Sequence, residues 1–236
     1  MDTCSTYALI FSPHPADNEF GLGGTVAKWV QEGKDVVYVI ATNGDKASSD
    51  IAMPASKLAV IREQEQRDAA NFLGVKEVVF LGHPDLGLED VPGLKKEMLR
   101  LYLFYRPEVV VTCDPNNPMY FSSPDHRVLG RAVMDAVWPL ALAPNYYRDL
   151  LAEGLRLHRA KELYLWQCGE PNYYNDISGF YEKKVQAMNF HQSQIGPNGS
   201  APDFPDMLRE ANKESGKKIN CEWAEAFHRE AVLQRL

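Results

Sequence analysis

This chain of 236 residues lacks several features that mark other classes of protein. Its 25 lysines and arginines are outnumbered by 32 aspartates and glutamates, so there is no basic excess to attract nucleic acid or an anionic membrane surface. No apolar run approaches the about 18 residues of a membrane span, and the first residues lack the basic and then apolar pattern of a secretion signal. The sequence therefore predicts a cytoplasmic protein that binds neither nucleic acid nor membrane.

Cysteine is also scarce. The chain has four cysteines and no Cys-x-x-Cys pair; they are Cys4, Cys113, Cys168 and Cys221. Thiols so far apart in the sequence indicate free cysteines in a reducing compartment, rather than disulfides or a thiolate metal site.

Apolar runs and helical patterns alternate over the first 140 residues. Four short apolar runs are typical of strands buried on both faces: Tyr7–Phe11, Val36–Ala41, Val78–Leu81 and Val109–Cys113. Helical spacing predicts helices over four other segments: Gly24–Glu32, Pro54–Leu73, Gly93–Tyr105 and Val128–Trp138. This alternation predicts an α/β fold, a Rossmann-like, doubly wound and mostly parallel sheet in a three-layer sandwich, with ligands at the carboxyl ends of the strands.

The alternation weakens from residue 140 to residue 236. A strand is predicted over Lys161–Trp166, a helix over Gly179–Gln192 and a last helix over Cys221–Arg235. Residues 197–205 are rich in glycine, proline, asparagine and serine, which predicts a loop. We therefore expect this part of the chain to be the less regular one.

Histidines and aspartates follow several of the predicted strands. His14 and Asp17 come after the first strand, Asp85 comes after the third, and Asp125 and His126 follow the fourth after a short loop. Because the carboxyl ends of parallel strands meet at one edge of a sheet, we expect these side chains to lie close together. A set of His14, Asp17 and His126 would leave a coordination position open, as catalytic zinc sites do, although these ligand types also suit other divalent ions.

Six motifs occur in one order along the chain: His14–Glu19, Arg62–Glu65, Pro84–Asp85, Asp125–Arg127, His191–Gln194 and Ala224–Arg229. Taken together they resemble the PIG-L/LmbE-type zinc-dependent N-deacetylases, and within that family the diacetylchitobiose deacetylase-like branch. The resemblance runs over nearly the whole chain. It implies one domain of this family over residues 1–236, with residues 140–236 as its less regular C-terminal part.

The resemblance implies a zinc-dependent hydrolase that removes an acetyl group from a small N-acetylglucosamine-type conjugate. It assigns His14, Asp17 and His126 as ligands of Zn²⁺. It also implies that Arg62 and Ser123 lie where the substrate binds.

Two positions depart from the family pattern. Where the family has an aspartate that acts as general base, this chain has Ala16, and where it has a histidine that stabilises the oxyanion, the chain has Ser123. Alanine cannot accept a proton, so reduced activity is expected. The candidates for a replacement base are Asp85, Asp125 and His228. His228 corresponds to a histidine that enters a neighbouring subunit's site in this branch, which implies a homo-oligomer, a trimer or a hexamer.

Two other interpretations stay open on the sequence. The chain could be a metal-binding pseudoenzyme or a sugar-binding protein of the same fold. Alternatively, Ala16 could be an aspartate-to-alanine exchange made to trap a substrate. Ser123 weighs against that exchange, since a single engineered change would leave the family's histidine in place.

Overall fold

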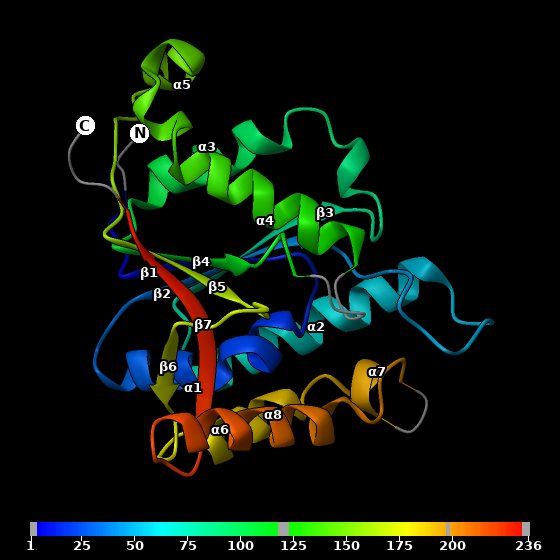
Figure 1. The fold of residues 1–236 in the computed structure, drawn as a ribbon. Helices are drawn as coiled ribbons and strands as arrows, with labels where there is room; N and C mark the ends of the chain where they lie inside the picture. The colour runs from blue at the N-terminus through cyan, green and yellow to red at the C-terminus, as the bar shows by residue number, and fades with distance from the viewer. Residues whose placement is uncertain (1–3, 118–122, 197–198, 233–236) are drawn as a thin grey trace.

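A seven-stranded sheet forms the centre of the computed structural model, which describes residues 4–117, 123–196 and 199–232 (Figure 1). The strand order is β3-β2-β1-β4-β5-β7-β6. Strands β1 to β5 are parallel, whereas β7 is antiparallel to both β5 and β6. The strands are β1 (Ala8–Ser12), β2 (Val36–Thr42), β3 (Glu77–His83), β4 (Val109–Cys113), β5 (Glu162–Trp166), β6 (Tyr173–Asp176) and β7 (Ala224–Ala231). The predicted α/β fold with a mostly parallel sheet is confirmed.

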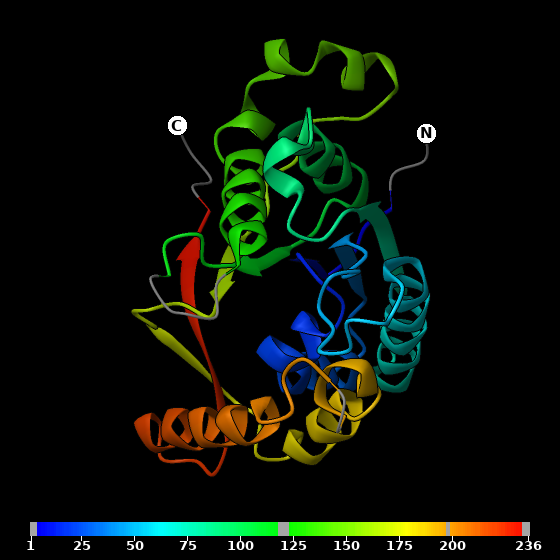
Figure 2. The ribbon, with the colours of Figure 1, turned by 90° about the vertical axis from the view of Figure 1, so that its right-hand side faces the viewer.

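Helices cover both faces of the sheet (Figures 1 and 2). Helices α3 and α4 lie over one face and α1 and α2 over the other, where α6 packs against α1. The helices are α1 (Asp17–Gln31), α2 (Ala55–Leu73), α3 (Leu94–Tyr105), α4 (Pro124–Val137), α5 (Arg148–Ala152), α6 (Tyr181–Met188), α7 (Gln192–Ile195) and α8 (Phe204–Lys218). In the described part of the chain, none of them is long and apolar enough to cross a membrane. The cysteines described there are all free thiols, as predicted.

The central strands divide their apolar side chains between the two faces of the sheet. In β1, Leu9 and Phe11 pack in the core beneath α3 and α4, while Ala8 and Ile10 pack in the core beneath α1 and α2. Successive side chains of a strand point to opposite faces, so a strand that is covered on both faces must be apolar throughout. Strands β1, β2 and β4 are buried along their whole length, which explains their continuous apolar runs.

The prediction of a last helix over Cys221–Arg235 is wrong. Residues 224–231 form β7, and residues 233–236 lie outside the described residues. This segment consists largely of good helix formers, but β7 pairs on both sides with strands that are distant in sequence, and that pairing overrides local propensity. Other differences are smaller: the helix predicted over 179–192 ends at Met188, and α8 was not predicted.

Glycines allow α1 to pack closely on β5 and on the segment that follows β6. The pattern of residues 21–24 predicts a tight turn before the helix, but these residues lie inside α1, where Leu22 leaves helical geometry at φ −149°. A Cβ atom on Gly21 would lie 2.8 Å from the Trp166 ring, and one on Gly24 would lie 2.7 Å from Ile177. The absence of a side chain at Gly21 and Gly24 therefore lets α1 approach Trp166 and Ile177 closely, and it does not serve to form a turn.

A buried ion pair satisfies the backbone at this kink in α1. The carboxylate of Glu225 accepts hydrogen bonds from the backbone N–H groups of Gly24, at 3.0 Å, and Thr25, at 2.7 Å. The Lys184 Nζ atom lies 2.7 Å from Glu225 Oε1, and the two side chains are 1% and 0% exposed. A carboxylate suits the positive end of a helix, and the lysine compensates its buried charge. Strand β7 is thus tied to α1 through Glu225.

Candidate active site

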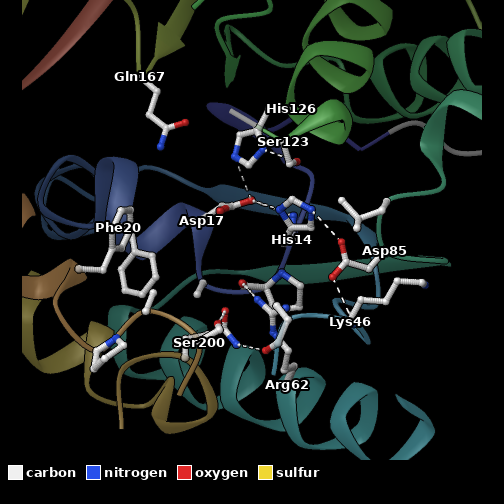
Figure 3. A pocket seen from close by; sticks show the side chains of 18 of the residues that line it. His14, Asp17, Phe20, Lys46, Arg62, Asp85, Ser123, His126, Gln167 and Ser200 are labelled. Atoms are coloured by element: carbon white, nitrogen blue, oxygen red, sulfur yellow. Dashed lines mark hydrogen bonds and ion pairs between the residues drawn. The ribbon is translucent and has the colours of Figure 1, made fainter. Parts of the chain in front are cut away.

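A cavity of about 550 Å³ opens at the carboxyl ends of strands β1 to β5 (Figure 3). Strand ends and the helices that follow them supply one set of lining residues: His14, Pro15, Ala16, Asp17, Phe20, Lys46, Ala47, Arg62, Asp85, Leu86, Ser123, His126 and Gln167. The C-terminal part of the chain supplies the others: Gln194, Ser200, Ala201, Pro202, Asp203, Phe204 and Met207. The cavity lies at the sheet edge where the sequence predicts a ligand.

Three side chains at this edge form a candidate metal group. The Asp17 Oδ2 atom lies 3.1 Å from His14 Nδ1 and 3.7 Å from His126 Nε2. One ligand atom from each residue lies within 4.8 Å of the others. The His126 Nε2 atom is buried and has no hydrogen-bond partner. A buried ring nitrogen without a partner beside a carboxylate oxygen fits a divalent metal ion, which takes up its lone pair.

Two further carboxylates hold the other side of the His14 ring. The His14 Nε2 atom lies 3.2 Å from Asp85 Oδ1 and 3.3 Å from Asp125 Oδ2. Asp125 is itself fixed, because its carboxylate accepts the backbone N–H groups of Leu86, at 2.6 Å, and Leu88, at 3.1 Å. A carboxylate on the second ring nitrogen is typical of metal-binding histidines, since it orients the ring and sets the tautomer. This contact directs Nδ1 of His14 towards Asp17.

Burial and neighbouring charges shift the pKa values of all three residues. Burial lowers the pKa of His14, but the surrounding carboxylates outweigh it and raise the pKa well above its usual range. Burial raises the pKa of the Asp17 carboxyl, but the two histidines outweigh it and lower the pKa below its usual range. Burial lowers the pKa of His126 to about 4. His126 therefore stays neutral near pH 7, and one of its two ring nitrogens carries a free lone pair.

Ser123 contacts the second ring nitrogen of His126. It immediately precedes α4, but its side chain makes no capping hydrogen bond to that helix. Instead, its Oγ atom lies 2.9 Å from His126 Nδ1. A hydroxyl that accepts a hydrogen bond from Nδ1–H favours the tautomer in which Nε2 is unprotonated and directed towards Asp17. Ser123 also lines the cavity.

Arg62 joins two of the loops that form the cavity. Its side chain is buried, and it donates hydrogen bonds to the carbonyl oxygens of Gly44, at 2.8 Å, and Pro15, at 2.7 Å. Glu65, one helical turn later, accepts hydrogen bonds from the backbone N–H and the hydroxyl of Ser193. The Arg62–Glu65 motif thus fixes both the loops beside the metal group and the segment around α7.

Ala16 adopts a left-handed conformation, with φ 86°. Such a conformation costs about 1–2 kcal/mol for a residue with a Cβ atom. A chain of buried polar groups supports it: the Ala16 N–H group donates to Gln66, Gln66 donates to Glu19, and Glu19 also contacts the His191 ring. The Ala16 methyl group packs with Phe20, so this point of the cavity wall has no group that could accept a proton.

The three candidate proton acceptors lie in different places. Asp85 lines the cavity, whereas Asp125 lies behind His14 and does not line it. His228 lies on β7, outside the cavity lining, and its ring contacts the Glu170 carbonyl oxygen and the Glu230 carboxylate. His228 pairs with Leu165 on β5 and does not line the cavity of its own chain, so its role in the cavity of a neighbouring copy stays a prediction.

The sequence predictions missed the apolar side of the cavity and Gln167, which follows β5. That side contains Phe20 from α1 together with Phe204 and Met207 from α8. The rings of Phe20 and Phe204 pack edge to face, with 4.9 Å between their centres. The position of Phe20 three residues after Asp17 was one available signal, and the helical spacing of Phe204, Met207 and Leu208 was another.

Comparisons with known proteins agree with the motifs at this site. The family described as "PIG-L: GlcNAc-PI de-N-acetylase" matches residues 9–137. Diacetylchitobiose deacetylase of Thermococcus kodakarensis is 36% identical over 187 residues, which cover 79% of this chain and 69% of that protein. A probable N-acetyl-alpha-D-glucosaminyl L-malate deacetylase 2 of Bacillus anthracis is 29% identical over 226 residues, which cover 93% and 92%. The structure of N,N'-diacetylchitobiose deacetylase from Pyrococcus horikoshii aligns with a TM-score of 0.89 at 30% identity, over 98% of this chain and 85% of that one.

Proposed function

Because the chain belongs to the PIG-L family, we propose that it is a metal-dependent N-deacetylase of N-acetylglucosamine-type conjugates. The observation that carries this proposal is the group of His14, Asp17 and His126 at the cavity, with its buried and unpartnered ring nitrogen. The names of the relatives support the reaction type. Ala16 favours a turnover below that of an enzyme with a carboxylate at this position.

In this proposal Zn²⁺ is the resident metal, with ligands from His14, Asp17 and His126. When bound, it supplies Lewis-acid activation of the amide carbonyl group and of water. The protein's part is to hold the ligands in place: Asp125 orients His14, and Ser123 orients His126.

Proton transfer falls to Asp85. Its side chain faces the cavity, with Oδ1 3.2 Å from His14 Nε2 and Oδ2 accepting the backbone N–H group of Lys46 at 3.3 Å. Asp85 is favoured over Asp125, because the Asp125 carboxylate is engaged by His14 and two backbone N–H groups and does not line the cavity. Asp85 is also shared with His14, so it replaces the absent carboxylate at position 16 only in part.

The amino sugar lies on the polar side of the cavity in this proposal. Arg62, Asp85 and Lys46 line that side and supply donors and acceptors of the kind that bind sugar hydroxyl groups. The proposal includes a homo-oligomer, a trimer or a hexamer, in which His228 reaches the cavity of a neighbouring copy. The position of His228 outside its own cavity supports this arrangement.

Metal content and acetate release test the proposal. We expect the zinc-loaded protein to hold about one ion per chain and to release acetate slowly from N,N'-diacetylchitobiose. His126→Asn should lose both properties, because it removes the unpartnered Nε2 atom. The matched control is His83→Asn, since His83 lies at the same sheet edge but contacts Glu97 and does not line the cavity.

The outcomes separate the proposed enzyme from the alternatives. A protein that binds zinc and the sugar but releases no acetate would be a sugar-binding pseudoenzyme, and the proposed activity would be wrong. A chain that takes up no zinc after loading would contradict both interpretations.

Ser123→Ala should weaken zinc binding by about 10–100-fold, the usual effect of losing a group that orients a metal ligand. The reason is the loss of the 2.9 Å contact that holds His126 Nδ1. Competition with a chromophoric chelator would measure the affinity. Ser123→Thr keeps the hydroxyl group and should restore it, whereas equal weakening in both variants would argue against this role.

A further inference from the structure

We propose that the cavity accepts N-acyl groups longer than acetyl, which lie along an apolar wall opposite the sugar. This inference rests on the proposed function, because it places the substrate amide at the group of His14, Asp17 and His126. The apolar wall consists of five cavity-lining residues: Ala16, Phe20, Ala201, Phe204 and Met207.

The apolar wall is continuous. Ala16 and Phe20 belong to one buried cluster, against which Phe204 packs. The Phe204 N–H group donates to the Ala201 carbonyl oxygen at 3.1 Å, and Met207 lies one helical turn beyond Phe204 on α8. Four segments of the fold, namely the loop after β1, helix α1, the segment before α8 and α8 itself, thus meet to form one apolar surface.

Two polar side chains beside the apolar wall, Ser200 and Gln194, already form hydrogen bonds with other groups of the protein. Ser200 donates to Gln194 Oε1, and the amide nitrogen of Gln194 donates to the carbonyl oxygens of Ala47 and Ser193. Asp203 is exposed and lies at the rim. An apolar chain on this wall therefore leaves the hydrogen bonds of Ser200 and Gln194 intact.

The candidate metal group lies between the apolar wall and the polar side of the cavity. Figure 3 shows Phe20 on one side of the His14–Asp17 pair and Asp85 with Lys46 on the other. An amide whose carbonyl group is at the metal group, and whose sugar is held on the polar side, directs its acyl carbon atoms towards Phe20. The acyl group is thus the part of the substrate that meets the apolar wall.

The apolar wall extends from the interior to the mouth of the cavity. Phe20 is 7% exposed, whereas Met207 is 43% exposed although it lines the same cavity. A flexible, exposed methionine at the mouth of a site is typical of surfaces that adapt to apolar ligands. Because the wall continues from the buried Phe20 to the exposed Met207, it leaves room for a chain longer than the methyl group of acetate.

Binding of N-acyl glucosamines that differ only in acyl length tests the inference. With zinc-loaded protein, isothermal titration should show about three- to fourfold tighter binding for each added methylene, and about tenfold from N-acetyl to N-butanoyl. A series that is flat or weakens with length overturns the inference while the proposed deacetylase stands. Failure of the whole series to bind, N-acetyl included, overturns the proposed function and this inference with it.

One variant in α8 and one at the residue just after it locate the acyl chain. Met207→Ser should bring the ratio of N-butanoyl to N-acetyl affinity close to one, because it removes the apolar wall at the mouth. Ile219→Ser is the matched control, since Ile219 is an exposed apolar residue at the far end of the same helix and does not line the cavity. A ratio that stays near ten in Met207→Ser would overturn the inference. Both side chains are exposed, and a melting curve confirms that each variant is folded.

Discussion

Replacing Ala16 with aspartate is expected to raise the rate of acetate release by about 10²–10⁴-fold, the usual contribution of a general base. The position lines the cavity beside Asp17, yet its methyl group offers nothing that could accept a proton. Aspartate also tolerates the left-handed conformation at φ 86° better than alanine does. The measurement is kcat of the zinc-loaded protein on N,N'-diacetylchitobiose.

Ala16→Asn is the matched control for that gain. Asparagine has the shape of aspartate and the same tolerance of the left-handed region, but it does not accept a proton. We expect Ala16→Asn to stay near the rate of the unmodified protein. Equal rates in Ala16→Asp and Ala16→Asn would show that the missing carboxylate is not what limits turnover.

Lys184→Met is expected to lower the free energy of unfolding by about 3–5 kcal/mol, because it leaves the Glu225 carboxylate buried without a counter-charge. The two side chains are 1% and 0% exposed, so water cannot replace the lysine without a rearrangement. Glu225 must stay in place, since it accepts the N–H groups of Gly24 and Thr25 at the kink of α1. Urea denaturation at neutral pH measures the loss.

The double variant Lys184→Met/Glu225→Gln separates charge from packing. It removes both charges but keeps a carbonyl oxygen that can accept from the kink. We expect it to recover part of the stability that Lys184→Met loses. If the two substitutions act independently, the double variant will be less stable than Lys184→Met by the free energy that Glu225→Gln alone removes. That result would contradict a charge-based explanation.

The parts of the candidate site that could be predicted from sequence are those carried by local patterns. His14 and Asp17 follow directly on a continuous apolar strand, and parallel topology then places them beside His126. A strand buried on both faces is apolar in any context, so this logic does not depend on distant contacts.

The apolar wall and β7 could not be predicted in this way. Phe204 and Met207 reach the cavity because α8 is held by β7, for example through the hydrogen bond from Asn212 to the Ala224 carbonyl oxygen at 3.0 Å. The segment of β7 is a strand because β5 and β6 supply its partners. Non-local pairing of this kind leaves no trace in the local spacing of apolar residues.

The place of β7 in the sheet has a consequence for biosynthesis. It lies between β5 and β6 although it follows both along the chain, so β6 has no neighbour in the sheet until residues 224–231 have been synthesised. The N–H groups of Gly24 and Thr25 likewise cannot donate to the Glu225 carboxylate until Glu225 has been synthesised. A nascent chain on the ribosome can thus pair β1 with β4, and so bring together the segments after them that carry His14, Asp17 and His126, before α8 has a surface to dock on. During synthesis, the metal group of this cavity can therefore assemble before its apolar wall does.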